Sequence, residues 1–486
     1  AKIVGKYLYD TPIPPQEDDE RIRTTVSGFP IKLYINDEVM GVFNFNLDKK
    51  DNDSFGLNKK KYEECVSYEV AANSNITAGA FNKWTSASGV SERDYYLADF
   101  ELRYPSINEE EGIGEDYKML TSLKRVVDWV SDASDEKFKT ELEQYFNKEY
   151  LIKYYIHTML FGMVDNFGKN MMLTTWDGNI WFPTFYDLDS CLGLDNTGYL
   201  KFDCDIEMAS GYFNTSTSKL WVKLQNVFSK EIKDTYKKLR STKYNYDNFM
   251  SILIGEQIDC IPETLYNIDS EQKYLKFGKE YLHMLHGSRR EHLKRWVKER
   301  ILFLDTVWEY DADTASSITL RANKQGAVYL DIQTYSPMYL KVVWRNNEEQ
   351  ILKVNRNQTV RFSSTLPTTT DQEIIVYGAK YLKDLGDLSN LNPSSMLLGN
   401  ATRLSKLKCT SKALLNVKID GMNFLRELDL TNCTLLGTGS SGANVMDVSS
   451  IKSLRVLKLQ GTAITSLITP QNGCNLEEIY FPNGIQ

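Results

Sequence analysis

Two kinds of periodicity divide the first 310 residues of the chain. Apolar and polar residues alternate in short runs near the N-terminus, which predicts strands at 31–35, 42–47 and 100–105, with 62–72 either a strand or a short helix. From residue 116 onward, apolar residues recur at helical spacing, over 116–130 and again after a helix start at Ser134 and Asp135. A part rich in strands is therefore expected to precede a part rich in helices.

One predicted hairpin, at 171–185, interrupts the helical part. Before it, residues 148–163 form a mostly apolar helix that we expect to be buried. After it, the spacing predicts helices at 220–239, 246–258, 272–285 and 289–308. The last of these carries many Arg and Lys residues, which we interpret as a solvated face that closes the helical part. A helix lying on a membrane surface is the alternative.

The pattern changes again beyond residue 311. Short runs with strand character follow one another at intervals of about ten residues, which is typical of a small β-sandwich. The runs are 318–320, 327–332, 339–344, 350–354, 359–362 and 373–377. A Leu-x-x-Leu-x-Leu-like motif then begins at Leu404, Leu425, Leu454 and Leu476, at spacings of 21, 29 and 22 residues. This repetition predicts leucine-rich repeats, with the longer interval occupied by the Gly/Ser loop at 437–444.

A chain of 486 residues is too long for one hydrophobic core, so several domains are expected. We predict a multidomain α+β protein with a bilobal domain at 1–310, whose β-rich N-lobe spans about 1–115 and whose helical C-lobe spans about 116–310. An all-β sandwich at 311–378 and a leucine-rich-repeat solenoid at 379–486 follow. The last repeat stops without a polar cap and the chain does not begin with Met, so we expect it to be part of a longer protein.

Composition removes several classes of function. The net charge of −8 argues against a general nucleic-acid binder. No run of about twenty apolar residues predicts a membrane span, and the N-terminus has no signal-peptide core. The seven cysteines include no Cys-x-x-Cys pair, which argues against a zinc site or a disulfide framework.

The candidate chemistry lies on both sides of the predicted hairpin. Asp165 is followed five positions later by Asn170, and Asp187 and Asp189 come directly after the hairpin. Protein kinases use this order: a catalytic Asp and a metal-binding Asn in one loop, then a metal-binding Asp. We assign Asp165 as the catalytic residue, Asn170, Asp187 and Asp189 as metal ligands, and Lys169 as a cation that neutralises the transferred phosphoryl group.

Other interpretations of these residues remain open. Asp, Asn and Gly are also ordinary turn residues. A pair of carboxylates would suit a glycosidase, although that activity would not explain the position of Asn170. No Gly-x-Gly-x-x-Gly loop is present, and the candidates for a phosphate-binding lysine are Lys49, Lys50, Lys59, Lys60 and Lys61. A partner carboxylate for such a lysine would come from Glu63, Glu64 or Glu69.

Five segments give the first 310 residues a resemblance to the spore-coat CotH family of atypical protein kinases. They are Leu33–Phe43, Phe100–Pro105, Val164–Asn170, Phe185–Asp189 and Arg295–Leu304. The resemblance implies a minimal kinase fold that uses ATP and Mg²⁺ or Mn²⁺ to phosphorylate protein Ser or Thr, with Asp165 catalytic and Asn170 with Asp187 or Asp189 on the metal. Leu188 stands where many relatives have Phe, which leaves open a pseudokinase.

Two hypotheses of function follow. In the first, the chain is an atypical protein kinase whose C-terminal modules bind a target. In the second, it is an inactive, kinase-like structural or adhesive protein of a virion (phage tail or capsid accessory), spore coat or cell surface, whose repeats bind partners or join a larger particle. Both place the protein outside the cell or on a particle, with a protein substrate or structural partner and no nucleic acid.

Overall fold

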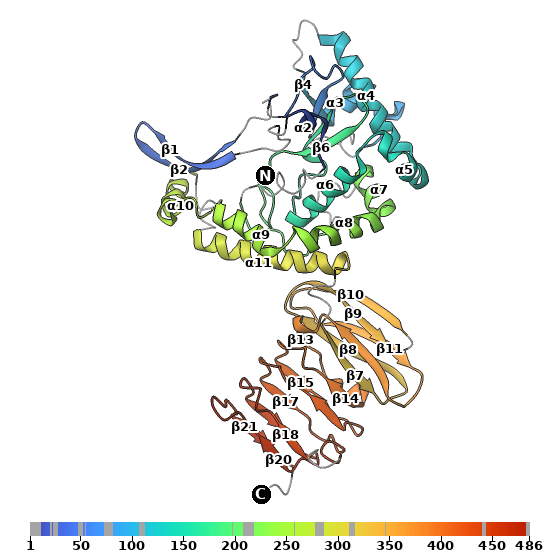
Figure 1. The fold of residues 1–486 in the computed structure, drawn as a ribbon, viewed down its shortest axis with the longest axis vertical. Coiled ribbons are helices and arrows are strands. Elements are labelled where there is room, and N and C mark those ends of the chain that lie inside the picture. The colour runs from blue at the N-terminus through green and yellow to red at the C-terminus, as the bar shows by residue number, and fades with distance from the viewer. Residues whose placement is uncertain are drawn as a thin grey trace. The chain divides into compact units, whose positions relative to one another are not determined.

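The computed structural model forms two compact units, Ala1–Ile301 and Leu302–Gln486 (Figure 1). It describes residues 11–19, 22, 28–46, 52–53, 55–71, 81–105, 112–196, 198–207, 218–256, 258–277, 286–310, 316–345, 347–439 and 444–482. No described helix is long and apolar enough to cross a membrane. All seven cysteines are free thiols.

A four-stranded antiparallel sheet lies at the centre of the first unit, in the order β4-β3-β5-β6. Its strands are β3 (Val66–Ala71), β4 (Phe100–Tyr104), β5 (Lys169–Thr175) and β6 (Trp181–Phe185). The predicted hairpin and the strand at 100–105 are confirmed, and 62–72 contains a strand rather than a helix. Every residue of β6 is buried, so both faces of the strand are covered.

Helices make up most of the rest of the first unit (Figure 1). They are α2 (Pro14–Asp18), α3 (Glu92–Asp99), α4 (Gly112–Asp132), α5 (Asp135–Glu141), α6 (Lys148–Phe161), α7 (Lys219–Val227), α8 (Ser229–Thr242), α9 (Tyr246–Met250), α10 (Glu263–Phe277) and α11 (His286–Val307). Short helical turns occur at Ser86–Ser88 and Leu142–Gln144, and a π-helical turn at Ser251–Glu256 continues α9. The helix predicted at 220–239 is two helices that meet at Phe228, and α10 begins before the predicted 272.

The buried helix α6 delivers the chain to the candidate site. Asn147 caps its start, since the Asn147 side chain accepts a hydrogen bond of 2.9 Å from the Tyr150 amide. All residues from Tyr150 to Phe161 are buried, as the apolar pattern predicted. Gly162 ends the helix in the left-handed conformation (φ +57°), and a Cβ there would lie 3.0 Å from Trp296. Glycine is therefore required where α6 turns toward Asp165.

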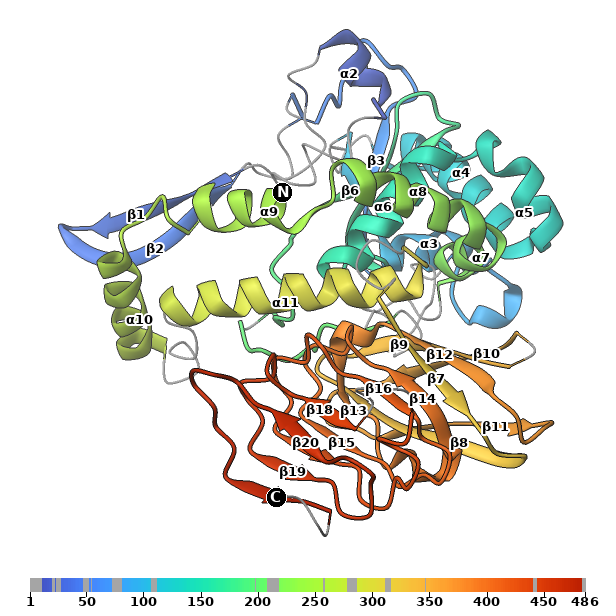
Figure 2. The ribbon, with the colours of Figure 1, turned by 60° about the horizontal axis from the view of Figure 1, so that its bottom comes forward.

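The strands predicted at 31–35 and 42–47 are confirmed as β1 (Gly28–Ile35) and β2 (Glu38–Asn46), which pair as a hairpin. Its two-residue turn places Asn36 and Asp37 at positive φ, which matches the right-handed twist of paired strands. The hairpin forms a sheet of its own, and Figure 2 shows it beside α10. The Val42 amide donates a hydrogen bond of 2.6 Å to the Asp269 carboxylate of that helix. The hairpin is thus attached to a helix that follows it by more than 200 residues.

A buried histidine links α6 to the chain after α8. The Nδ1 atom of His157 lies 2.8 Å from the Lys153 carbonyl, which can only accept, so Nδ1 carries the proton. The Nε2 atom then accepts from the Tyr244 hydroxyl at 2.6 Å. Burial lowers the pKa of His157 to about 4, so the ring is neutral in the folded protein.

We expect this histidine to make the first unit sensitive to acid. In the unfolded chain, a histidine has a pKa of about 6.5. The free energy of unfolding therefore falls as the pH drops from there toward the folded pKa of about 4. At pH 5 the loss is expected to be about 2 kcal/mol. Urea unfolding of the wild type and of His157→Gln at pH 7 and pH 5 measures it, because the variant lacks the titrating group. Equal pH dependence in the two proteins would contradict this assignment.

The second unit contains all six strands predicted between 318 and 377. They are β7 (Ser317–Ala322), β8 (Gly326–Thr334), β9 (Met338–Trp344), β10 (Glu348–Val354), β11 (Val360–Leu366) and β12 (Gln372–Tyr377). One sheet has the order β10-β9-β12-β7-β14-β16 and another has the order β11-β8-β13, with β13 at Leu382–Asp384, β14 at Pro393–Leu397 and β16 at Asn416–Lys418. Because β14 and β16 lie in the predicted repeat region, the first of these sheets continues past the predicted boundary at residue 378. A separate sandwich at 311–378 therefore stays a prediction.

The repeats form a β-solenoid. Its parallel strands β15 (Lys406–Lys408), β17 (Glu427–Asp429), β19 (Val456–Lys458) and β21 (Glu478–Tyr480) make one sheet, and β18 (Val445–Asp447) and β20 (Ser466–Ile468) make another. Leu407, Leu428, Leu457 and Ile479 stand in register, as the repeat spacing requires. Strands occupy both sides of the described coils, whereas leucine-rich repeats usually have a helix on one side. The assignment of the coils as leucine-rich repeats therefore stays a prediction.

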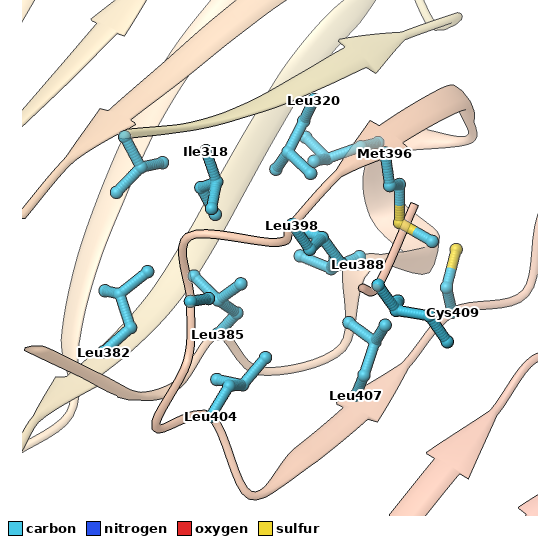
Figure 3. Close-up of a cluster of buried hydrophobic side chains, with 14 of the residues drawn as sticks. Ile318, Leu320, Leu382, Leu385, Leu388, Met396, Leu398, Leu404, Leu407 and Cys409 are labelled. Atoms are coloured by element: carbon cyan, nitrogen blue, oxygen red, sulfur yellow. The ribbon is translucent and has the colours of Figure 1, made fainter. Parts of the chain in front are cut away.

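One buried cluster runs through the second unit without a break at the predicted boundary. Figure 3 shows Ile318 and Leu320 of β7 together with Leu388, Leu404 and Leu407 of the repeat region. Short helical turns at Ala379–Tyr381 and Leu388–Leu391 join the two parts. The strands before and after residue 378 therefore share a hydrophobic core.

Candidate functional site

Buried aromatic residues hold the loop that carries Asp165. Tyr154 of α6 stacks on Phe185, with ring centroids 4.1 Å apart, and its hydroxyl donates a hydrogen bond of 2.7 Å to the Asn166 carbonyl. The indole nitrogen of Trp221 donates to the Phe167 carbonyl at 2.7 Å. The backbone on the C-terminal side of Asp165 is thus fixed to α6, α7 and the end of β6.

Asn166 joins the two halves of the site. Its side chain is 1% exposed, and its amide nitrogen donates hydrogen bonds of 2.8 Å to the carbonyls of both Asn170 and Tyr186. These carbonyls lie at the start of β5 and just after β6, so one amide fixes the loop of Asp165 against the segment of Asp187. Sequence reasoning missed this residue, because an Asn beside Asp165 carries no signal that separates it from an ordinary turn residue.

The segment with Asp187 and Asp189 runs beside the Asp165 loop. The Val164 amide donates to the Ser190 carbonyl at 3.2 Å, and the Leu192 amide donates to the Phe161 carbonyl at 2.8 Å. The Ser190 hydroxyl donates to the Asp189 carboxylate at 3.1 Å. Two loops that are twenty residues apart in sequence therefore lie side by side.

The structure brings five of the seven predicted site residues to these adjacent loops. The Lys169 amide donates to the Asp165 carbonyl at 2.9 Å, which closes the turn before β5. Asn170 and Asp187 both adopt the left-handed conformation, with φ of +52° and +49°. Asn and Asp tolerate this conformation better than other residues with a Cβ. The backbone thus turns at the two residues that we predicted to bind metal.

The carboxylates influence one another. Although the Asp187 side chain reaches solvent, partial burial raises the pKa of its carboxyl above the ordinary value, and Asp189 and Asp165 raise that pKa further. The Lys169 ammonium opposes this shift, and the buried carboxylate of Glu69 adds to it. Excess negative charge is therefore concentrated around Asp187.

A hard divalent cation fits this donor set. Asp165, Asn170, Asp187 and Asp189 offer oxygen atoms alone, which suits Mg²⁺ or Mn²⁺. A cation would also relieve the repulsion that raises the pKa of Asp187. The three Asp carboxylates do not all lie within 4.8 Å of one another; among the described residues, Asp203, Cys204 and Glu299 form the group that does. Shared ligation of one ion by all three Asp would therefore need side-chain movement.

Comparison with known proteins assigns the family. The model of the CotH kinase protein family matches residues 25–300, which is more than half of the chain and includes both loops of the site. The chain belongs to this family. A search of curated proteins finds no match. Membership in the CotH kinase family agrees with a kinase-related protein and, in general terms, with the use of a nucleotide and a divalent metal.

The lysine expected to bind phosphate in this CotH domain is not identified. Lys49 and Lys50, which we predicted to contact the nucleotide, lie outside the described residues, so both stay predictions. Among the alternatives, the Lys61 ammonium lies 2.8 Å from an Asp18 carboxylate oxygen. Of the candidate carboxylates, Glu69 pairs with an arginine, Arg103, whose Nε atom lies 2.6 Å away. Sequence reasoning missed this pair, because it forms across two strands.

A small hollow adjoins the site on the central sheet. Apolar side chains and hydroxyls line it, from Phe55, Leu57, Ser67, Met172, Thr174, Trp176 and Thr184. Met172 lies two residues after Asn170 on β5, and Thr184 lies three residues before Asp187, opposite Met172 in the sheet. The hollow holds about one water molecule and lies among buried side chains of the sheet, two to three residues along the strands from Asn170 and Asp187.

Proposed function

We propose that the chain is an atypical protein kinase that transfers the γ-phosphate of ATP to a Ser or Thr hydroxyl of a protein, with Mg²⁺ or Mn²⁺. The observation that carries this proposal is the side-by-side placement of two loops, one with Asp165 and Asn170 and one with Asp187 and Asp189, joined by the buried amide of Asn166. Phosphoryl transfer depends on positioning and electrostatics, which such a rigid arrangement provides.

Each side chain has a role in this reaction. Asp165 orients the acceptor hydroxyl and accepts its proton as the oxygen bonds to the γ-phosphorus, the bond to the β,γ-bridging oxygen breaks, and ADP leaves. Asn170 and Asp187 hold the metal, with Asp189 as a further ligand or as the group that orients Asp187. The bound metal supplies positive charge to the phosphate oxygens. Lys169 adds positive charge next to Asp165.

The second unit is proposed to bind the protein substrate or a structural partner through its β-solenoid. We retain the small sandwich and the leucine-rich repeats as the finer description of this unit. The CotH family is associated with the spore coat, which supports a place on the spore coat, with a cell surface or a virion as the alternatives. An inactive structural protein is the competing function, and the same experiment separates the two.

The test is phosphate incorporation from γ-labelled ATP into a Ser-rich acceptor protein in the presence of Mg²⁺ or Mn²⁺. We expect incorporation that EDTA abolishes and that Asp165→Asn lowers by roughly 100-fold or more, since the variant removes the proton acceptor and keeps the shape of the loop. Unchanged thermal unfolding of the variant is the control for folding. If the wild type incorporated no more phosphate than Asp165→Asn, the kinase proposal would be rejected and the structural function would remain.

A further inference from the structure

A second cluster of metal-ligand side chains lies outside the two acidic loops, which are the loops that carry Asp165 and Asp187. The carboxylates of Asp203 and Glu299 and the thiol of Cys204 each offer one ligand atom, and these three atoms lie within 4.8 Å of one another. Asp203 and Cys204 follow the acidic loops in the chain, whereas Glu299 belongs to α11. Two segments that are distant in sequence therefore bring these groups together.

Helix α11 holds the backbone around this cluster. The indole nitrogen of Trp296 donates a hydrogen bond of 3.2 Å to the Phe202 carbonyl. The Arg300 guanidinium donates a hydrogen bond of 2.8 Å to the Cys204 carbonyl. Trp296 and Arg300 lie three residues before and one residue after Glu299 on the same helix. The ligand atoms thus stand on fixed backbone, which a metal site needs in order to bind with little rearrangement.

The Cys204 thiol points to a bound ligand. Cys204 is fully buried, and within the described part of the chain its amide and carbonyl form hydrogen bonds while its Sγ atom forms none. The buried thiol of Cys433, by contrast, donates to the Cys409 carbonyl at 3.4 Å. A cysteine that only fills space is expected among apolar side chains, and the Cys204 thiol instead lies beside two carboxylates.

The charges around this thiol favour a cation. Burial raises the pKa of the Cys204 thiol well above its ordinary value, and the carboxylates of Asp203, Glu299 and Asp205 raise it further. The Arg300 guanidinium opposes this shift without outweighing it. A divalent cation reverses the effect, because it stabilises the thiolate. On binding, the S–H bond breaks, a metal–sulfur bond forms, and the proton passes to solvent.

One sulfur and two oxygen ligands select zinc over the harder cations. Zn²⁺ accepts both thiolate and carboxylate, whereas Mg²⁺ and Mn²⁺ prefer oxygen ligands. Tetrahedral zinc, with bonds of about 2.3 Å to sulfur and about 2.0 Å to oxygen, places its ligand atoms about 3.5 Å apart. Rotation of the two carboxylate side chains, which are less buried than the thiol, closes the site to this size. Three protein ligands leave the fourth position to water.

We propose that Asp203, Cys204 and Glu299 bind a zinc ion that cross-links the segment after the acidic loops to α11. The site is a mixed one, so the lack of a Cys-x-x-Cys pair, which argues against a cysteine-rich zinc site, does not bear on it. The inference goes beyond the proposed phosphate transfer and does not depend on it, because the metal proposed at the acidic loops has oxygen ligands alone.

The experiment titrates Co²⁺ into the reduced, chelator-treated protein in the presence of excess Mg²⁺. Co²⁺ stands in for Zn²⁺, because a thiolate ligand on cobalt gives a sulfur-to-metal charge-transfer absorption, and Mg²⁺ occupies sites that have only oxygen ligands. We expect this absorption to saturate at one equivalent of Co²⁺ and to disappear when Zn²⁺ displaces the cobalt. Cys204→Ser is expected to lose the absorption, and Glu299→Gln to bind Co²⁺ roughly tenfold or more weakly.

Two variants serve as matched controls. Cys260→Ser removes an exposed thiol of the same unit, which tests whether an accessible cysteine binds the cobalt. Glu291→Gln removes an exposed carboxylate of α11, which is paired with Lys294 at 3.1 Å. Both variants are expected to keep the absorption and the Co²⁺ affinity of the wild type.

The results decide the zinc site separately from the kinase. A wild type without the charge-transfer absorption would overturn the zinc proposal and leave the proposed phosphate transfer standing. Absorption retained by Cys204→Ser would assign the cobalt to another thiol and would also overturn it. If Cys204→Ser fails to fold, the Glu299→Gln variant decides, since a Co²⁺ affinity equal to that of the wild type would remove the link to α11. Zn²⁺ is further expected to raise the melting temperature of the wild type, and an unchanged melting temperature would contradict the cross-link.

Discussion

Replacing Asp187 with asparagine is expected to lower metal-dependent phosphate transfer by roughly 100-fold or more and to raise the metal concentration needed for half-maximal activity. The carboxylate is one of the few charged oxygens that can hold the metal, and an amide oxygen is a weaker ligand for a hard cation. The measurement is the initial rate of transfer as a function of Mn²⁺ or Mg²⁺ concentration.

The choice of asparagine matters because of the backbone. Asp187 has a φ of +49°, and a Cβ-bearing residue other than Asn or Asp would cost roughly 1 kcal/mol there. An alanine variant would therefore combine loss of the ligand with strain in the loop. Asn keeps the conformation and the size, so a change in rate reports the carboxylate itself.

A surface carboxylate provides the control for this prediction. Asp132→Asn removes an exposed carboxylate at the end of α4, which is paired with Lys83 at 2.6 Å. We expect it to leave both the rate and the metal dependence unchanged. A metal dependence of Asp187→Asn that matches the wild type would show that Asp187 is not a ligand.

Local pattern was sufficient to predict much of this fold. Alternation predicted strands at 31–35 and 42–47, within the observed hairpin of β1 and β2, and the long apolar run predicted the buried helix α6. The repeat spacing predicted the register of the solenoid strands that carry Leu428 and Leu457. These signals are reliable because each residue's environment depends on its own element and on neighbours at fixed spacing.

What the sequence did not reveal depends on tertiary contacts. The attachment of β2 to α10 through Asp269 joins residues that are 227 positions apart. The second strands of the solenoid coils, such as β16, lie outside the Leu-x-x-Leu-x-Leu motif and have no repeated signal of their own. At the site, the spacing of Asp165, Asn170 and Asp187 was visible, whereas Asn166 acts through hydrogen bonds to the carbonyls of Asn170 and Tyr186.

Arg300 shows how distant residues hold the site together. Its side chain is fully buried, and burial lowers the pKa of the guanidinium to about 10, so the group remains charged at neutral pH. It donates hydrogen bonds to the carbonyls of Met159 at 2.9 Å, Cys204 at 2.8 Å and Ile206 at 2.6 Å. Met159 lies near the end of α6, before Asp165, and Cys204 and Ile206 lie after Asp189. One side chain of α11 therefore fixes the chain on both sides of the acidic loops.

Replacing Arg300 with methionine is expected to lower the free energy of unfolding of the first unit by about 3 kcal/mol. Methionine fills most of the volume of the arginine side chain but leaves three buried carbonyls without their hydrogen-bond donor. Part of this loss is offset, because the variant no longer buries a charged group. Urea unfolding followed by tryptophan fluorescence measures the effect, since all tryptophans except Trp308 and Trp344 belong to this unit. Arg295→Met, an exposed position on the same helix, is expected to change stability by no more than about 0.5 kcal/mol. Equal stability of the two variants would mean that other contacts hold the ends of the two loops, and the site would then not depend on α11.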